Sequence, residues 1–423
     1  MENRLSLKRK IVLFLVLNGF YFFSYFHRVG IPGTIFNQLQ IDFHLTANQV
    51  AGLGTIVLGI YGMLQFFIGP FMDFFGTNRI FVGGGFLLCL GSFLFSLSHS
   101  VFLLYFSRVL VGFGASVAFL GIVKKTDELF GDDFFSVMLG IALFLGYSGG
   151  LFATLPFERL VAAFGWRNTI FWLSAILLVI MITILFDFSK NNLLKHQKSS
   201  ISFSDIKTAI LNRKSYPVII VASINFTIYF LFQGIIGKKL LQDICQLSSK
   251  TAASFTFTMM AGAMFFVLFW GSLVHIIKKR KKLVNYICFI STFSCVLMFF
   301  NLILWKEPMI FFFSFFLFAS VGGCSPLTTT IIKEINPSTV GTSVGFINGI
   351  CYLLVAISGN MTGFIMDRFS SKAIVTDEAV IYPALAYVAV CLMCFFYSLI
   401  ALSASFKISE VGKEQAVEIP API

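Results

Sequence analysis

The sequence predicts an all-α polytopic membrane protein whose twelve transmembrane helices form two six-helix bundles. The chain has 423 residues, of which 57% are hydrophobic and only 12% are charged, and its mean hydropathy is +0.89. A water-soluble domain with this composition would lack the polar residues to cover its surface. Apolar stretches of about 20 residues recur along the chain, and each is long enough to cross a hydrocarbon core of about 30 Å as a helix. The short alternating segments typical of a membrane β-barrel are absent from the sequence.

The apolar stretches fall into two sets of six, separated by a polar connection. We predict spans at residues 11–36, 49–72, 80–97, 101–123, 134–157, 169–187, 217–237, 251–277, 283–304, 309–332, 340–365 and 383–406. The corresponding domains are an N-terminal bundle (1–188), a cytoplasmic linker (189–216), a C-terminal bundle (217–407) and a cytoplasmic tail (408–423). Most cysteines lie inside spans, where they serve as small apolar residues, so we expect no disulfide, no metal and no cofactor.

The distribution of basic residues predicts the orientation. With the N-terminus in the cytoplasm, the inner loops contain the basic runs 8–10, 124–125 and 278–282 and the linker lysines, whereas the outer loops hold far fewer, such as Arg159 and Lys238. Because lysine and arginine concentrate in cytoplasmic loops, we expect both termini to be cytoplasmic. Topology and anionic lipid explain these clusters, so membrane lipid is an expected partner and nucleic acid is not.

The loop between the second and third spans contains Gly69, Asp73, Gly76 and Arg79 in the spacing G-x-x-x-D-x-x-G-x-x-R. This pattern in this loop resembles the signature of the major facilitator superfamily. The resemblance implies that the glycines allow close helix packing and a tight turn, and that the acid forms part of an inner gate, as a breakable electrostatic latch. The alternative is a pair of solvated loop charges.

The fourth span opens with Arg108 and Gly112, similar to the superfamily's R-x-x-x-G motif. Arg108 then contributes to proton coupling or to packing near the outer side, or it is an interfacial anchor that snorkels to water. Lys124 lies sixteen positions further on, about 24 Å along a helix, so it cannot share a site with Arg108. Lys124 either contacts a substrate or an acid, or is an ordinary positive charge of an inner loop. For Lys125 we expect the ordinary loop charge.

Arg28 lies well inside the first span, where a charge is tolerated mainly if it faces a wet cavity, a partner or a ligand. Asn18, Tyr21 and Tyr25 share its helix face, because they precede it at helical spacings. His27 points about 100° away and either packs against a neighbour or takes part in coupling. Each uncharged polar residue on its own suits interhelical hydrogen bonding, but as a set facing Arg28 they predict a binding chamber. Its further members are Asn225, Tyr229, Gln233, Asn348 and Tyr352.

Arg28 also predicts the class of ligand, because its planar fork suits a carboxylate or a phosphate. The seventh span lacks the second arginine that sugar-phosphate exchangers of the superfamily use. A monocarboxylate or a zwitterion, such as an amino acid, therefore fits better than a phosphate ester. The Tyr-Phe-x-Arg of the first span and the Phe-Leu-Gly-x-x-Lys of the fourth resemble proteobacterial amino-acid and nutrient transporters of intracellular bacteria. This resemblance implies the inner membrane of a bacterium.

Together these observations predict a monomeric secondary transporter, not an enzyme, that moves a small organic solute by alternating access. No Walker loop is present, so ATP is not the direct energy source. Protons are a candidate coupling ion through His27, Lys124 or a carboxyl group; uniport and exchange stay open, because no acidic residue is evident in the central membrane. The alternatives are a non-transporting nutrient sensor and an exporter. An intramembrane enzyme would need a convergent nucleophile and base or metal ligands, and no H-E-x-x-H is present.

Overall fold

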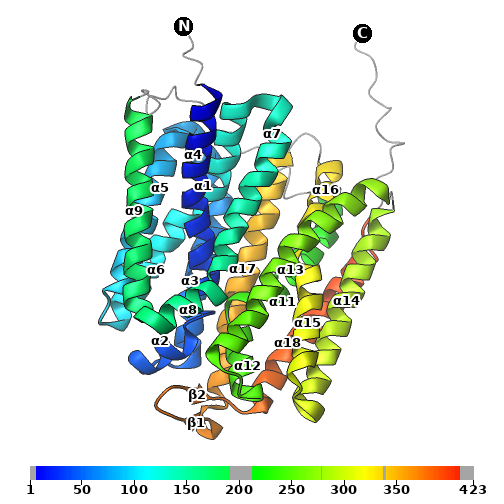
Figure 1. Cartoon of the computed structure of the whole chain (residues 1–423). Coiled ribbons are helices and arrows are strands. Elements are labelled where there is room, and N and C mark those ends of the chain that lie inside the picture. Colours follow the sequence, from blue (N-terminus) through cyan, green and yellow to red (C-terminus); the bar gives the residue numbers. More distant parts are fainter. Residues whose placement is uncertain (1–5, 191–211, 278, 337–339, 410–423) are drawn as a thin grey trace.

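Long helices run side by side and form two halves, α1 to α9 and α11 to α18 (Figure 1). The computed structural model describes residues 6–190, 212–277, 279–336 and 340–409. Most of the predicted linker 189–216, and all but the first two residues of the predicted tail 408–423, lie outside the described residues.

The described part of the first half consists of helices and the turns and loops that join them. Its elements are α1 (Leu7–Gly30), α2 (Phe36–Asp42), α3 (Ala47–Gln65), α4 (Ile68–Phe75), α5 (Thr77–Ser96), α6 (Val101–Ser116), α7 (Ala118–Phe152), α8 (Leu155–Phe164) and α9 (Trp166–Lys190).

The second half adds a small β-hairpin to its helices. Its elements are η1 (Arg213–Ser215), α11 (Tyr216–Gly234), α12 (Gly237–Cys245), α13 (Ser249–Ile276), α14 (Arg280–Phe300), the π-helical turn η2 (Asn301–Trp305), α15 (Pro308–Gly322), α16 (Ser325–Ile335), α17 (Val340–Asp367), η3 (Ser370–Lys372), β1 (Ile374–Val375), β2 (Val380–Ile381) and α18 (Ala384–Ser405). The two strands are antiparallel and pair Ile374 with Ile381.

The predicted membrane spans are confirmed. Within the described residues, eleven helical stretches are long and apolar enough to cross a membrane, and a bent helix pair raises the number to twelve. That pair joins residues 137–152 to α8 at an angle of 42°. It corresponds to the predicted fifth span at 134–157. The fourth span is interrupted between α6 and α7, and the helical run then continues to Gly131, whose positive φ of 66° ends it.

Local sequence signals explain where several helices begin. Thr46 and Gln49 form a reciprocal capping box ahead of α3, with hydrogen bonds of 3.2 Å and 2.9 Å. Proline occupies the first turn of α8, α11, α15 and α16, where its missing N–H costs no intrahelical bond.

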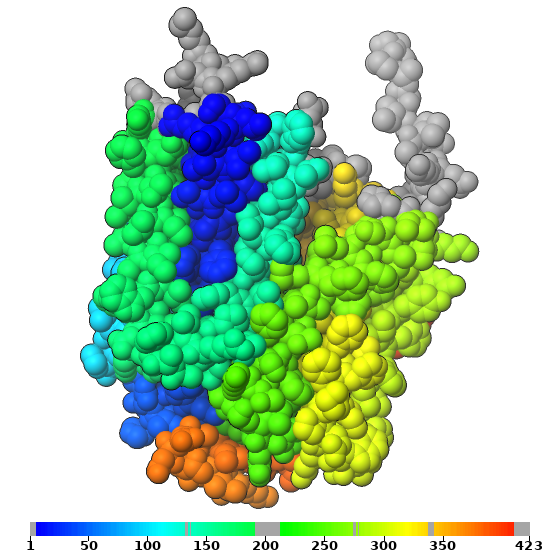
Figure 2. Space-filling model, in the orientation of Figure 1, coloured from blue at the N-terminus to red at the C-terminus, as the bar shows by residue number. Residues whose placement is uncertain are grey.

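The two ends of the helix bundle differ in structure. We call the end that carries the start of α1, the α4–α5 loop and the end of α18 the terminal side, and the opposite end, with α2, α8, α12 and the β-hairpin, the hairpin side (Figure 1). Figure 2 shows that the surfaces of α7 and α13 are separated toward the terminal side, while the two halves meet toward the hairpin side. The sequence predicted plain outer loops on the hairpin side, where the structure has short helices and strands.

Helices α3 and α17 pack closely across the boundary between the halves. A Cβ placed on Gly62 would lie 2.9 Å from the Gly349 carbonyl oxygen, and one on Gly349 would lie 2.9 Å from that of Gly62. The two backbones approach this closely only because both residues lack a side chain. Tyr61 directly precedes Gly62 on α3 and Tyr352 follows Gly349 by three residues on α17, so this contact brings the two tyrosine rings together, at 4.5 Å between centroids.

Candidate functional site: a buried arginine among tyrosines

Arg28 lies in the last turn of α1 and is only 2% exposed. Its Nη1 donates to the hydroxyl of Tyr352 at 2.7 Å, and its Nε donates to the carbonyl of Ser24 at 3.2 Å. Within the described residues, Nη2 has no hydrogen-bond acceptor and no acid forms an ion pair with Arg28. In the described part of the chain, the guanidinium is therefore buried without an acidic partner.

Three tyrosine rings surround this cation. The guanidinium carbon lies 4.0 Å from the ring centroid of Tyr25, 4.7 Å from that of Tyr61 and 5.5 Å from that of Tyr352. A cation over an aromatic face gains about 0.5–2 kcal/mol per contact, more when water is excluded. We call Tyr25, Tyr61 and Tyr352 the tyrosine cage. Its residues come from α1 and α3 of the first half and from α17 of the second half.

Further aromatic rings extend the cage. Tyr147 of α7 lies 4.8 Å from Tyr25, and Phe226 of α11 lies 5.1 Å from Tyr352, measured between ring centroids. Sequence reasoning missed Tyr61, Tyr147 and Phe226. Nothing in their local pattern distinguishes them from ordinary packing residues, so only the fold brings them to Arg28.

The structure places the other polar residues of α1 along the same buried helix. Tyr21 packs edge-on against Tyr25 at 5.8 Å between centroids. Asn18 lies one turn earlier and donates to the carbonyl of Phe14 at 2.8 Å, while its Oδ1 has no partner among the described residues. The predicted stripe therefore runs from Arg28 toward the terminal side.

The predicted residues of α11 have different surroundings. Tyr229 directs its hydroxyl to the sulfur of Met260 at 3.2 Å. Gln233 is buried, and neither of its amide atoms has a partner within the described residues. Asn225 donates to Cys288 of α14 at 3.6 Å, so it faces the interior of the second half rather than the tyrosine cage.

On α17, two predicted residues face the first half. Tyr352 receives the hydrogen bond from Arg28, and Asn348, one turn earlier, donates to Gln65 of α3 at 3.3 Å. Sequence reasoning had not singled out Gln65. Both contacts cross the boundary between the halves, so they would change if the halves moved relative to each other.

Arg108 is fully buried and binds backbone carbonyls. Its Nε donates to Leu53 of α3 at 2.8 Å, and its Nη2 donates to His27 and Ile31 at 2.9 Å and 3.1 Å. These contacts connect α6 to α3 and to the end of α1. His27 is buried, and the Nδ1 of its imidazole has no partner among the described residues. Gly112, one turn after Arg108, lets α6 approach Ile60 of α3.

The loop motif forms an ion pair at the terminal side. Asp73 of α4 accepts from Lys124 of α7, and their side chains are 57% and 28% exposed. Gly69 begins the motif in α4, Gly76 has a φ of 94° at the turn, and Arg79 lies in the first turn of α5. The predicted tight turn at Gly76 is thus present. Lys124 reaches an acid, one of the two roles proposed for it.

Lys125 differs from the expectation of an ordinary loop charge. It is buried, pairs with Glu128 at 2.5 Å and lies 5.0 Å from the ring centroid of Phe188. The sequence pattern could not show this, because the covering residue comes from the distant end of α9.

The hairpin side is held closed by a buried ion pair between the halves. Lys238 of α12 pairs with Glu158 of α8, at exposures of 4% and 5%, and also donates to the carbonyl of Thr34 at 2.5 Å. Burial lowers the pKa of Lys238, and the nearby Glu158 carboxylate opposes this shift. A lysine predicted to lie in an outer loop is therefore inserted from the second half into the first.

Other polar contacts reinforce this closure. Asp367 at the end of α17 accepts from the backbone N–H groups of Ala47 and Asn48 at 2.8 Å and 3.1 Å, at the positive end of the α3 dipole. Gln40 donates to the hydroxyl of Tyr382 at 3.0 Å. Both contacts connect the first half to the second.

A second buried ion pair braces α12 within its own half. Lys239 pairs with Asp243 at 2.6 Å, and Asp243 also accepts from the backbone of Tyr382 and the hydroxyl of Tyr387. Burial lowers the pKa of Lys239 and raises the pKa of Asp243, and their mutual attraction opposes both shifts. This network holds α12 against the strand hairpin and α18, which keeps Lys238 in position.

Two stretches with the letters G-x-S-x-G, at 146–150 and 341–345, lie inside α7 and α17. A hydrolase nucleophile of this pattern sits on a sharp turn from strand to helix. Neither stretch has that setting.

Comparison with known proteins agrees with the fold. Two crystal structures of a bacterial homolog of the human lysosomal transporter Spinster, both inward-facing, resemble the chain. The unoccupied form is 14% identical, with 94% of each chain covered and a TM-score of 0.67. The occupied form is 15% identical, with 95% of this chain and 94% of that chain covered and a TM-score of 0.68.

A crystal structure of a mutant of the nucleoside transporter NupG is 12% identical, covers 94% of this chain and 99% of its own, and has a TM-score of 0.71. At these identities the likeness concerns the fold alone. No curated protein matches the sequence. The family model of the Major Facilitator Superfamily matches residues 17–359, which is most of the chain. This multi-pass membrane protein therefore belongs to the Major Facilitator Superfamily.

Proposed function

We propose that this transporter carries a small organic solute with one carboxylate, either a monocarboxylate or a zwitterion such as an amino acid, and that Arg28 binds the carboxylate. The observation that carries the proposal is the buried Arg28 guanidinium, whose Nη2 has no acceptor within the described residues. An unsatisfied buried donor is costly, so an anion that accepts from it gains binding energy.

The charge of the site supports a single negative group on the substrate. Among the described residues, Arg28 is the cation enclosed by the tyrosine cage, and Arg108 already binds three backbone carbonyls. A phosphate ester would bring a second charge with no matching cation in the cage. The remaining lining, with Tyr21, Tyr147 and Phe226, suits the organic part of the solute.

The contacts that the two halves share around Arg28 support alternating access. Arg28 and Tyr25 belong to the first half and Tyr352 to the second, so rocking of the halves would open the cage to one side and then the other. Lys238, Glu158 and Asp367 close the hairpin side in this structure. With both termini in the cytoplasm of a bacterium and the chain in its inner membrane, this arrangement is inward-facing.

His27 and Lys124 are the residues proposed to couple transport to protons. His27 is buried beside the backbone that Arg108 binds, and Lys124 forms an ion pair that can break at the terminal side. We propose that the protein works as a monomer, because each half contributes residues to one shared site.

The test is uptake into proteoliposomes that contain the purified protein, with and without an inward proton gradient. The panel consists of amino acids, small monocarboxylates, sugar phosphates and nucleosides. Nucleosides are included because an aromatic lining also accepts a planar base and one structural neighbour is a nucleoside transporter. We expect saturable uptake of a carboxylate or an amino acid, and its loss in Arg28→Ala at near-normal expression.

Other outcomes separate the alternatives. Binding of a solute without flux would identify a sensor. Efflux from preloaded vesicles that exceeds uptake in the same orientation would identify an exporter. Preference for sugar phosphates or nucleosides, unchanged in Arg28→Ala, would refute the proposed site.

A further inference from the structure

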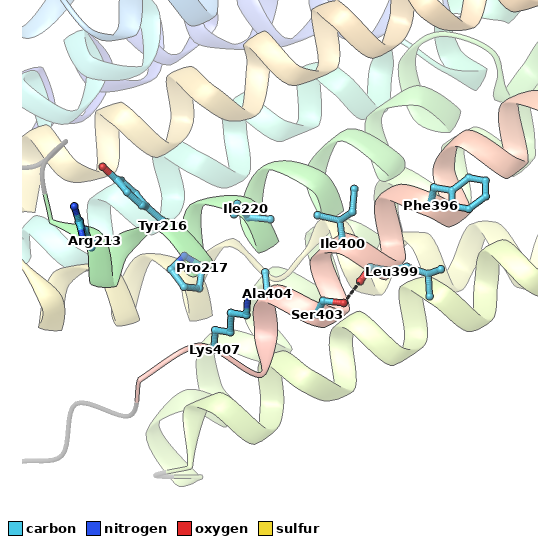
Figure 3. A pocket seen from close by; sticks show the side chains of 10 residues that line it. All are labelled: Arg213, Tyr216, Pro217, Ile220, Phe396, Leu399, Ile400, Ser403, Ala404 and Lys407. Carbon is cyan, nitrogen blue, oxygen red and sulfur yellow. Dashed lines mark hydrogen bonds between the residues drawn. The ribbon is translucent and has the colours of Figure 1, made fainter.

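A groove of about 570 Å³ lies between α11 and α18, on the second half and away from the tyrosine cage (Figure 3). Figure 3 shows Arg213, Tyr216 and Lys407 toward one end of this groove and Phe396 at the other. The basic end belongs to the terminal side, where α11 starts and α18 ends. None of these residues belongs to the proposed transport site.

The polar end of the groove carries two positive charges. Arg213 and Lys407 are exposed, and neither forms an ion pair with an acid in the part of the chain that the structure describes. The turn that carries Arg213 is anchored from both sides: Asn212 donates to Asn336 at 2.7 Å, and Asn336 donates to Ser215 at 2.9 Å. The backbone turn that carries Arg213 is therefore held by the fold.

The rest of the groove is mainly apolar and is exposed on membrane-spanning helices. Ile220 of α11 and Phe396 and Ile400 of α18 remain 37%, 60% and 53% exposed on membrane-spanning helices. Phe396 and Lys407 are eleven positions apart, which corresponds to about 16 Å at the rise of an α-helix. That length matches half of a hydrocarbon core of about 30 Å, which is one leaflet.

We propose that this groove binds an anionic phospholipid from the leaflet on the terminal side. The headgroup phosphate lies between Arg213 and Lys407, and an acyl chain follows Ile220, Ile400 and Phe396 toward the bilayer centre. Charge complementarity selects an anionic lipid over a zwitterionic one, because basic pockets between transmembrane helices attract negative headgroups. The bound lipid joins α11, which carries Tyr229 and Gln233, to α18, and stabilises the second half.

The test measures lipid binding to the purified full-length protein by native mass spectrometry and by the shift in apparent Tm. The probes are phosphatidylglycerol, phosphatidylcholine of the same chains, and soluble glycerol phosphate. The double variant Arg213→Gln/Lys407→Gln removes the two positive charges of the groove. The variant Ile400→Trp fills the apolar part of the groove with a larger side chain. The matched control, Lys8→Gln/Lys10→Gln, removes two charges from the first half on the same side.

We expect wild type and the control to retain phosphatidylglycerol in preference to phosphatidylcholine and to gain Tm with it. The charge variant should bind it about 25-fold more weakly, because each basic side chain at a membrane surface strengthens the attraction by about fivefold. Ile400→Trp should also lose it. Equal retention by the charge variant and the control overturns the proposal. An equal Tm shift with glycerol phosphate also overturns it, because that result indicates a site for free anions. A change of oligomeric mass in the variants without loss of lipid overturns it as well, because that result indicates a contact between copies of the protein.

Discussion

The guanidinium of Arg28 donates to the hydroxyl of Tyr352 at 2.7 Å and thereby connects α1 of the first half to α17 of the second at the centre of the molecule. The same tyrosine packs against Tyr61 at 4.5 Å between ring centroids. The proposed substrate-binding residue Arg28 of the first half is thus oriented by Tyr352 of the second half. Movement of the halves and binding of the substrate are therefore expected to affect each other.

Tyr352→Phe tests whether this hydroxyl orients Arg28. The ring remains over the cation but the acceptor is lost, so we expect KM for the carboxylate substrate to rise about fivefold, the effect of one hydrogen bond of about 1 kcal/mol. The measurement is initial uptake in proteoliposomes. Tyr397→Phe is the matched control, because its hydroxyl receives a hydrogen bond from Ser358 within the second half. Equal KM values for the two variants would argue against the orienting role.

Breaking the buried ion pair at the hairpin side should strongly destabilise the closed form. Glu158→Gln leaves the charge of Lys238 buried with only the Thr34 carbonyl, and loss of one partner of such a pair costs about 3–5 kcal/mol. The double variant Glu158→Leu/Lys238→Met should recover most of that loss. The apparent Tm of the single and double variants measures the coupling.

Lys372→Gln serves as the control for the ion-pair variants, since Lys372 is exposed on the same side and should change stability by less than about 0.5 kcal/mol. If Glu158→Gln behaves like this control, the pair does not hold the hairpin side closed.

The ion pair of Asp73 and Lys124 should matter for transport rate more than for stability. Both side chains are partly exposed, and such pairs contribute about 0–1 kcal/mol. We expect Asp73→Lys to slow uptake with little change in Tm, and the charge swap Asp73→Lys/Lys124→Asp to restore part of the rate. A swap that stays as slow as the single variant would show that the pair itself is not the latch.

The architecture could be predicted from the sequence because hydrophobic length and the placement of charge report directly on membrane spans. The stripe of Tyr21, Tyr25 and Arg28 was also predictable, since it depends only on helical spacing. Tyr61 and Tyr147 were not, because their roles depend on how α3 and α7 pack against α1.

The hairpin side shows the same limit. Lys238 has the sequence pattern of a loop residue, and only the packing of α12 against α8 buries it with Glu158. Asn225 shares a helix face with Tyr229 in the sequence, yet it contacts Cys288 inside the second half. Patterns within one helix cannot decide which of two neighbouring helices a side chain meets.

Arg108 should contribute to the stability of the fold and not to substrate binding. Replacing it with Leu removes its three hydrogen bonds to the carbonyls of Leu53, His27 and Ile31, which should cost about 2–4 kcal/mol in total and lower expression and Tm. Arg108→Lys should recover part of the loss. KM of the remaining active protein should stay near the wild-type value, whereas a large KM change at normal Tm would assign Arg108 to the substrate site.

The most direct test of the account compares a carboxylate substrate with its neutral amide in wild type and Arg28→Gln, at matched amounts of folded protein. If Arg28 binds the carboxylate, wild type should prefer the acid by about 10- to 100-fold in kcat/KM, and Arg28→Gln should transport acid and amide about equally. An unchanged preference for the acid in Arg28→Gln would contradict the proposed role of this arginine.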